Sequence, residues 1–251
     1  MTAALLETHA LSRNFGALVA AREIDFRLGA GARHALIGPN GAGKTTFINL
    51  LTGVLRPSEG QILLKGEDIT AVAQADRVKR GIARTFQINR LFRGLTVLEN
   101  VYIAVSERLG AAPTMLAPAG KRRDVIDESM HLLETLNLQD DAHLRISELP
   151  YGRQRLVEIA IALGLKPEVL LLDEPAAGVP SAESHIILNA IDELPKQIGV
   201  LIIDHDMDLV FRFAQRITVL VQGAVFAEGT PKEIGANADV RAVYLGQAEH
   251  G

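Results

Sequence analysis

Residues 38–46 read Gly-Pro-Asn-Gly-Ala-Gly-Lys-Thr-Thr and match the phosphate-binding pattern G-x-x-x-x-G-K-[ST]. Residues 34–37 before this stretch suit a short buried strand, and residues 47–51 after it suit the first turns of a helix. The glycines allow the backbone N–H groups to close around phosphate oxygens, and a helix N-terminus adds partial positive charge. The alternative is a glycine-rich turn that binds no ligand. Such a turn does not require a strand before it and a helix after it.

We expect Lys44 to reach the β- and γ-phosphates of a nucleotide, and Thr45 to hold Mg²⁺ through its hydroxyl. The predicted nucleotide-binding residues of this loop are Gly38, Pro39, Asn40, Gly41, Ala42, Gly43, Lys44, Thr45 and Thr46.

The composition limits the class of protein. A chain of 251 residues, 48% of them apolar, can form one large domain or two small ones. The net charge of −4 argues against a nucleic-acid partner, and the lack of cysteine excludes disulfides and thiolate metal sites. The N-terminus does not read as a signal peptide, and no stretch approaches the roughly 18 apolar residues of a membrane span. We therefore expect any membrane role to depend on a partner.

Apolar strands alternate with helical segments along the chain, which predicts a parallel sheet with both faces covered. We expect residues 109–120 to form a loop. The predicted strands are 3–12, 20–28, 61–65, 169–172, 200–203, 217–222 and 224–227, and the predicted helices are 76–83, 124–138, 153–165 and 181–193.

Two further segments complete a hydrolytic site. The apolar run 169–172 delivers Asp173, a candidate Mg²⁺ ligand, and Glu174, a candidate general base, to the end of a strand. An Asp-Glu pair alone is often only a solvated strand end, but the phosphate loop favours the catalytic interpretation. A second apolar strand ends at Asp204-His205-Asp206, and His205 is a candidate partner for the γ-phosphate or the attacking water.

Together these segments resemble the nucleotide-binding subunits of ABC transporters, over essentially the whole chain. Gly38–Thr46 is similar to their Walker A motif and Leu170–Glu174 to Walker B, and His205 is similar to the switch histidine. The resemblance implies that Gln87 is the Q-loop residue that touches Mg²⁺ or water. It also implies that Phe15, twenty-three residues before Gly38, stacks on adenine, although a core Phe is the alternative.

A finer resemblance points to the branched-chain amino acid importer branch. It rests on residues 81–87, 90–92, 95–101, 173–178, 205–207, 227–231 and 244–246. Related importers in this branch take urea, short amides or aromatic acids. The implied fold is α/β: a RecA-like P-loop ATPase core with an N-terminal antiparallel β subdomain, and an α-helical subdomain. The implied chain is a single nucleotide-binding domain over 1–251, with the core and β subdomain in 1–87 and 161–251 and the helical subdomain in 88–160.

The chain departs from the family pattern at the signature motif, Leu-Ser-[Tyr/Gly]-Gly-Gln, which contacts the nucleotide held by the opposite subunit. Here the run is Leu149-Pro150-Tyr151-Gly152-Arg153-Gln154. Proline lacks both a hydroxyl and an N–H, although it is tolerated at a helix start. By resemblance Tyr151, Gly152 and Arg153 contact that nucleotide, and Arg153 supplies compensating charge. A second departure is Pro180, where the family has Asp or Asn.

The resemblance implies an ATPase that uses ATP and Mg²⁺ and lies peripherally on the cytoplasmic face of the inner membrane. It implies integral-membrane permeases near Gln87–Phe92 as partners, and a periplasmic solute-binding protein indirectly. Because Pro150 weakens only the site that this chain completes, we expect a heterodimer with a second ATPase subunit; a homodimer is the alternative in isolation. The other functions considered are a weakly hydrolysing nucleotide switch and a soluble, non-transport ABC ATPase.

Overall fold

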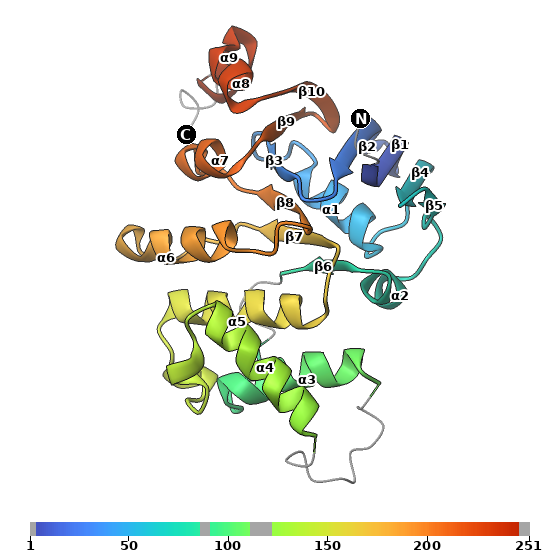
Figure 1. The fold of residues 1–251 in the computed structure, drawn as a ribbon. Helices are drawn as coiled ribbons and strands as arrows, with labels where there is room; N and C mark the ends of the chain where they lie inside the picture. The colour runs from blue at the N-terminus through green and yellow to red at the C-terminus, as the bar shows by residue number, and fades with distance from the viewer. Residues whose placement is uncertain (1–3, 86–90, 111–121, 246–251) are drawn as a thin grey trace. The chain divides into compact units, whose positions relative to one another are not determined.

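The computed structural model describes residues 4–85, 91–110 and 122–245, and their side chains except those of 181–184, 244 and 245. The chain forms two compact units (Figure 1). Unit 1 comprises Met1–Ile82, Glu168–Glu174 and Pro195–Gly251, and unit 2 comprises Ala83–Pro167 and Pro175–Leu194. The subdomain limits at 88 and 160 stay a prediction. None of the described helices combines the length and apolarity that crossing a membrane requires.

Unit 1 contains an antiparallel sheet of the order β2-β1-β4-β5. Its strands are β1 (Ala4–Phe15), β2 (Leu18–Gly29), β4 (Glu59–Leu64) and β5 (Glu67–Asp68). In β2, Ile24, Phe26 and Leu28 are buried while the residues between them are exposed, as expected for a strand with one face on the core. The predicted N-terminal antiparallel sheet is confirmed.

The second sheet has the order β10-β9-β3-β8-β7-β6. Its strands are β3 (Arg33–Ile37), β6 (Ile82–Arg84), β7 (Val169–Asp173), β8 (Gly199–Ile203), β9 (Arg216–Val221) and β10 (Ala224–Gly229). The pairs β3–β8, β3–β9 and β7–β8 are parallel, and β10 runs antiparallel to β9. The predicted parallel sheet is confirmed for its central strands, which are almost wholly apolar because both faces are buried.

The register of this sheet aligns the strand ends that carry the predicted site. Leu36 of β3 and Asp173 of β7 both pair with Ile203 of β8, so the three strands end at one level. β8 lies between β3 and β7, so the strand that leads to the phosphate loop is not the direct neighbour of the strand that delivers Asp173. The shared edge, rather than direct pairing of the two strands, brings their ends together.

Helix α1 (Lys44–Thr52) packs its apolar face into the core of unit 1. Phe47, Ile48, Leu50 and Leu51 are fully buried in one cluster with side chains from both sheets. The ring of Phe47 meets Phe26 of β2 edge-on, with 5.4 Å between centroids. The helix that begins at the phosphate loop is therefore held by both sheets.

Arg77 anchors the far end of α1 from the short helix α2 (Gln74–Lys79). Its fully buried guanidinium donates to the carbonyls of Leu50 and Leu51, at 2.7 and 2.9 Å, and to those of Thr70 and Val72. A cation at a helix C-terminus opposes the negative end of the helix dipole. The predicted helix 76–83 is wrong at its end, because Gly81 (φ 99°) turns the chain into β6.

Unit 2 contains helices α3 (Val97–Arg108), α4 (Arg123–Thr135), α5 (Tyr151–Gly164) and α6 (Ser181–Asp192), with 3-10 turns at Gln139–Asp141 and Ile146–Glu148. Helices α3, α4 and α5 pack side by side (Figure 1). Thr96 and Glu99 form a capping box at the start of α3, a helix that the apolar periodicity did not predict. The predicted helices 124–138, 153–165 and 181–193 are confirmed as α4, α5 and α6 within a few residues.

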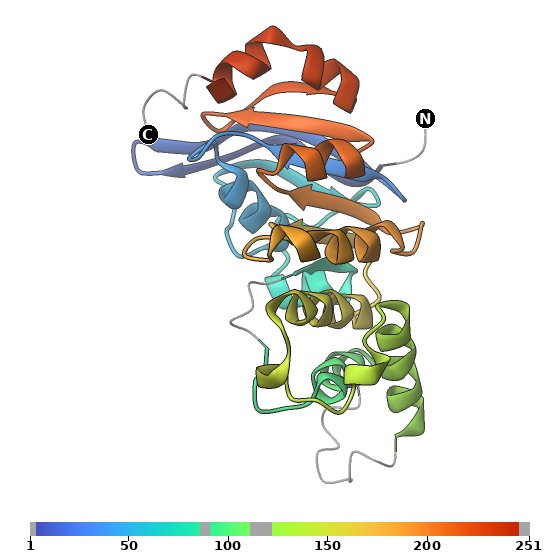
Figure 2. The same ribbon diagram turned by 90° about the vertical axis from the view of Figure 1, so that its left-hand side faces the viewer.

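Three short helices complete unit 1: α7 (Met207–Phe213), α8 (Pro231–Ala236) and α9 (Ala238–Leu245). Helices α8 and α9 follow strand β10 at the C-terminal end of the described chain (Figure 2). Thr230 and Glu233 cap the start of α8, with Pro231 as its first residue.

Candidate active site

The phosphate loop has the backbone geometry that the sequence predicts. Gly38 (φ 156°) and Gly43 (φ 101°) lie in the region that L side chains rarely adopt. A Cβ on Gly38 would lie 2.3 Å from the Leu220 carbonyl oxygen, and one on Gly43 would lie 2.5 Å from that of Ala20. Both positions therefore require glycine, and Gly43 forms the start of α1.

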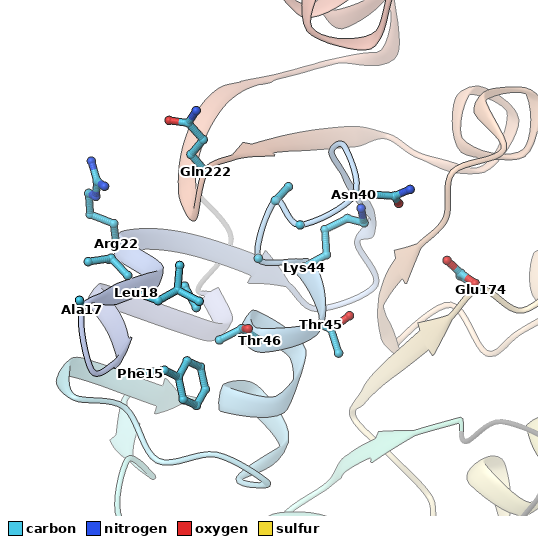
Figure 3. A pocket seen from close by; sticks show the side chains of 15 residues that line it. Phe15, Ala17, Leu18, Arg22, Asn40, Lys44, Thr45, Thr46, Glu174 and Gln222 are labelled. Carbon is cyan, nitrogen blue, oxygen red and sulfur yellow. The ribbon is translucent and has the colours of Figure 1, made fainter. Parts of the chain in front are cut away.

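A cavity of about 690 Å³ opens over this loop (Figure 3). It extends from the exposed ring of Phe15, at the end of β1, to the carboxylate of Glu174, at the end of β7. Its size falls within the usual range for a site that binds a small ligand. The lining residues are Phe15, Ala17, Leu18, Val19, Ala20, Arg22, Asn40, Gly41, Ala42, Gly43, Lys44, Thr45, Thr46, Glu174 and Gln222.

Lys44 is one of two basic residues that line this cavity within the described part of the chain, together with Arg22. Its Nζ donates to the carbonyl oxygens of Gly38 and Pro39, at 2.6 and 3.0 Å, so the loop holds its own ammonium group. Burial lowers the pKa of Lys44, while the nearby carboxylates of Glu174 and Asp173 oppose that shift. The Walker A lysine and both predicted Walker B acids thus act on one another within unit 1.

Glu174 leaves the end of β7 in a backbone conformation that is unusual for a non-glycine residue, with φ of 46°. Its N–H donates to the Ile203 carbonyl of β8 at 2.8 Å, which ties the turn to the neighbouring strand. Its carboxylate is 44% exposed and lies 3.5 Å from Nδ1 of His205. Strained backbone held by its surroundings is a recurrent feature of active sites.

Asp204 holds the backbone that carries the histidine. Its Oδ1 accepts the N–H groups of His205 and Asp206, at 2.8 and 2.9 Å, and fixes the turn after β8. Burial raises the pKa of Asp204, whose side chain is only 4% exposed and whose Oδ2 has no hydrogen-bond partner within the described residues. Asp204 was not among the predicted site residues, although a carboxylate at the end of an apolar strand was a signal for it.

The residues present fit a bound Mg²⁺. The ion prefers oxygen ligands and usually keeps several waters, so one hydroxyl, one or two carboxylates and the phosphates of a nucleotide suffice. Thr45 lies in the first turn of α1 and lines the cavity, and Asp173 is close enough to influence the charge of Lys44. Among the described residues, no group of three or more His, Cys, Asp or Glu side chains is arranged to hold a metal ion.

The third predicted catalytic residue, Gln87, lies outside the described residues, as do Phe86 and Arg90. Its expected contact with Mg²⁺ or water stays a prediction.

The signature-like run starts helix α5 in unit 2. Pro150 precedes the helix with φ of −56°, and its carbonyl accepts the N–H of Gln154 at 3.1 Å, so the helix forms without a side-chain cap. The guanidinium of Arg153 forms an ion pair with Asp141 and donates to the Asn137 carbonyl at 2.8 Å. The compensating charge predicted for Arg153 is therefore already paired within unit 2.

Tyr151 and Gly152 stand at the same helix start. The guanidinium of Arg155 lies 5.5 Å from the centroid of the Tyr151 ring. A Cβ on Gly178 would come within 3.1 Å of the Tyr151 hydroxyl, so the tyrosine packs closely on the segment after Walker B. Gly152 is buried in the first turn of α5.

Several lining residues were missed from the sequence. Leu18, Val19 and Arg22 come from the start of β2, and Gln222 (φ 50°) comes from the turn between β9 and β10. These positions reach the cavity only through long-range folding, and no local motif marks them.

Comparisons with known proteins agree with this geometry. The family model described as ABC transporter matches residues 21–177, and that described as branched-chain amino acid ATP-binding cassette transporter matches residues 224–250. The chain is 38% identical to the high-affinity branched-chain amino acid transport ATP-binding protein BraF of Pseudomonas aeruginosa. It is 39% identical to the corresponding protein LivG of Escherichia coli, and each alignment covers 99% of this chain and 100% of the relative.

Solved structures agree as well. The ADP conformation of an ATP-binding cassette of an ABC transporter superimposes with a TM-score of 0.87 at 31% identity, covering 98% of this chain and all of that one. A nucleotide-free cassette gives a TM-score of 0.84 at 30% identity, covering 96% of this chain and 98% of that one. The chain therefore belongs to the ABC transporter family, among the ATP-binding proteins of branched-chain amino acid transport.

Proposed function

We propose that this chain binds and hydrolyses ATP to drive an importer for branched-chain amino acids or related small solutes. The observation that carries the proposal is one cavity that joins the phosphate loop, Lys44 and Glu174, with His205 3.5 Å from Glu174. Binding of ATP closes a dimer of ATPase subunits, and hydrolysis with product release reopens it.

In this proposal different residues of the chain bind the nucleotide and catalyse its hydrolysis. Backbone N–H groups of Gly38–Thr46 and the ammonium of Lys44 hold the phosphates, and Phe15 stacks on the adenine. Glu174 accepts a proton from the attacking water as general base, and His205 orients the water or a γ-phosphate oxygen. Thr45, Asp173 and Gln87 would hold Mg²⁺, which supplies charge neutralisation at the phosphates when bound.

The partners belong to the same proposal. The relatives are named as transport ATP-binding proteins, so we infer membrane permeases as partners and a periplasmic solute-binding protein that acts through them. In unit 2 the side chain of Phe92 is 56% exposed directly after the Q-loop segment and offers an apolar contact for a permease. The chain then lies on the cytoplasmic face of the inner membrane as a peripheral subunit.

We also infer a heterodimer with a second ATPase subunit whose signature motif is intact. Pro150 offers no hydroxyl to a γ-phosphate, and Arg153 is committed to Asp141. The site that this chain completes with residues 149–154 is therefore the weaker one, and the site built on its own Lys44 and Glu174 is the productive one.

The alternative function is a weakly hydrolysing nucleotide switch. If the altered signature dominates both sites, the chain acts as a nucleotide switch that binds ATP and hydrolyses it slowly. The steady-state ATPase rate of the purified transporter separates the two functions, because the switch would turn over far more slowly than transport requires.

Uptake in the source organism tests the proposal. Replacing the chromosomal gene with a Lys44→Ala version is expected to abolish uptake of labelled leucine, isoleucine and valine, while uptake of labelled lysine stays unchanged. A Lys65→Ala version is the control, since Lys65 is exposed and pairs with Glu168. Loss of urea, amide or aromatic-acid uptake instead would reassign the solute, and no change in any uptake would contradict the transport role.

A further inference from the structure

We propose that Arg13 is a positioning residue for the adenine ring of the bound nucleotide, and that it acts by holding Phe15 as a preformed stacking platform. The inference rests on the proposed function, which places the adenine on Phe15. It assigns a role to a residue that no sequence motif marks.

The contact between the two side chains is direct. The guanidinium carbon of Arg13 lies 4.6 Å from the centroid of the Phe15 ring, within the range of a cation–π interaction. The two residues are two positions apart near the end of β1. Phe15 lines the 690 Å³ cavity and Arg13 does not, so the guanidinium contacts the ring without occupying the space for the nucleotide.

Arg13 is itself fixed to the segment that follows the phosphate-binding helix. Its Nη1 donates to the carbonyl of Arg56 at 3.0 Å. Two further bonds secure the same strand end: Ser58 N–H donates to the Ser12 carbonyl at 2.8 Å, and Asn14 N–H donates to Ser58 Oγ at 3.1 Å. Since α1 ends at Thr52, these bonds tie the end of β1 to the chain just beyond the helix that starts at Lys44.

The platform requires such support because it stands at a hairpin tip. Phe15 is 43% exposed and Leu18 is 65% exposed, on either side of a turn at Gly16 (φ 60°). An exposed aromatic ring on a short turn otherwise samples several rotamers, and ordering it on binding lowers affinity. A guanidinium held against the ring restricts those rotamers before the nucleotide binds. The distance between the phosphate loop and the Phe15 ring is then already set.

The test compares ATP with inorganic tripolyphosphate, which has the phosphates but no base. In the full-length chain, Arg13→Met keeps the apolar stem and removes the cation, and Arg13→Lys keeps a cation. We expect Arg13→Met to weaken ATP binding about two- to fivefold, with tripolyphosphate binding unchanged and with affinity largely kept in Arg13→Lys. Arg27→Gln is the control, because Arg27 is exposed and pairs with Glu7 on the same sheet.

Phe15→Ala separates this inference from the proposed function. It is expected to weaken ATP binding selectively, and Arg13→Met added to it should cause no further loss. If Phe15→Ala weakens ATP binding but not tripolyphosphate binding, and Arg13→Met shows no such difference, then the role proposed for Arg13 is wrong and the stacking role of Phe15 is kept. Equal weakening of both ligands by Arg13→Met or, should that variant not fold, by Arg13→Gln would show a merely structural role. If Phe15→Ala does not weaken ATP binding relative to tripolyphosphate binding either, the proposed adenine site itself is wrong.

Discussion

Nδ1 of His205 lies 3.5 Å from Oε1 of Glu174, at the carboxyl ends of two adjacent parallel strands. The pairing of Asp173 with Ile203 sets this closeness, because Glu174 follows β7 by one residue and His205 follows β8 by two, so both leave the sheet at nearly the same level. Glu174 N–H also donates to the Ile203 carbonyl at 2.8 Å. The two side chains therefore meet because of the backbone.

His205→Ala is expected to lower ATP turnover about a hundredfold with little change in ATP affinity, since the imidazole acts on the reacting groups rather than on binding. Steady-state hydrolysis and equilibrium binding on the same preparation check this. His131→Ala is the matched control, because that imidazole is exposed on α4 of unit 2. A variant with wild-type turnover would remove His205 from the mechanism.

Lys44→Ala is expected to abolish measurable ATP binding, because residues 38–46 then carry no charged side chain to bind the phosphates. Titration calorimetry with ATP and Mg²⁺ measures the effect, and Lys65→Ala should bind as the wild type does. Nucleotide affinity retained within a few-fold in Lys44→Ala would contradict the assigned role of the loop.

Pro150→Ser adds a hydroxyl at the start of α5, where Pro150 supplies no side-chain cap. The change should stabilise the chain by about 1 kcal/mol through the new cap. It should also raise ATP turnover at the site that residues 149–154 complete by about tenfold or more, because one hydrogen bond to a charged phosphate is restored there. Urea unfolding and hydrolysis assays measure the two effects separately. Greater stability with unchanged turnover would show that the altered signature does not limit catalysis.

Glu158 gives unit 2 a dependence of stability on pH. Burial raises the pKa of this carboxyl to about 7, against the opposing effect of Arg155 at 2.9 Å. The folded chain holds this proton more tightly than the unfolded chain does. The bound proton therefore contributes fully to the free energy of unfolding below the unfolded pKa of 4.5, and this contribution is lost as the pH rises toward 7. From pH 4.5 to 7.5 the wild type should therefore lose stability relative to Glu158→Gln, by up to about 3 kcal/mol. Denaturant unfolding at both pH values checks this, and parallel pH profiles would contradict it.

The phosphate loop and the ends of β7 and β8 could be predicted because their signals are local. The glycines of 38–43, the apolar runs before Asp173 and His205, and the spacing between these segments all depend on short stretches of sequence. Parallel strands covered on both faces must be apolar throughout, which made the core strands recognisable.

Features made by contacts distant in the sequence could not be predicted. The pairing of Arg153 with Asp141, the cap that Arg77 places on α1, and the placement of β8 between β3 and β7 depend on how remote segments fold together. Helix α3 was not predicted from the sequence, although Thr96 and Glu99 carry a capping-box signal.

The most direct test of the account is single-turnover hydrolysis by Glu174→Gln in the assembled transporter. The amide keeps the size of the side chain but cannot accept the proton of the attacking water. Glu67→Gln is the control, since Glu67 is exposed and pairs with Arg80 away from the cavity. We predict that Glu174→Gln binds ATP with Mg²⁺ as tightly as the wild type and releases phosphate at least about a hundredfold more slowly. Phosphate release at a near-normal rate would place the general base elsewhere and exclude Glu174 from that role.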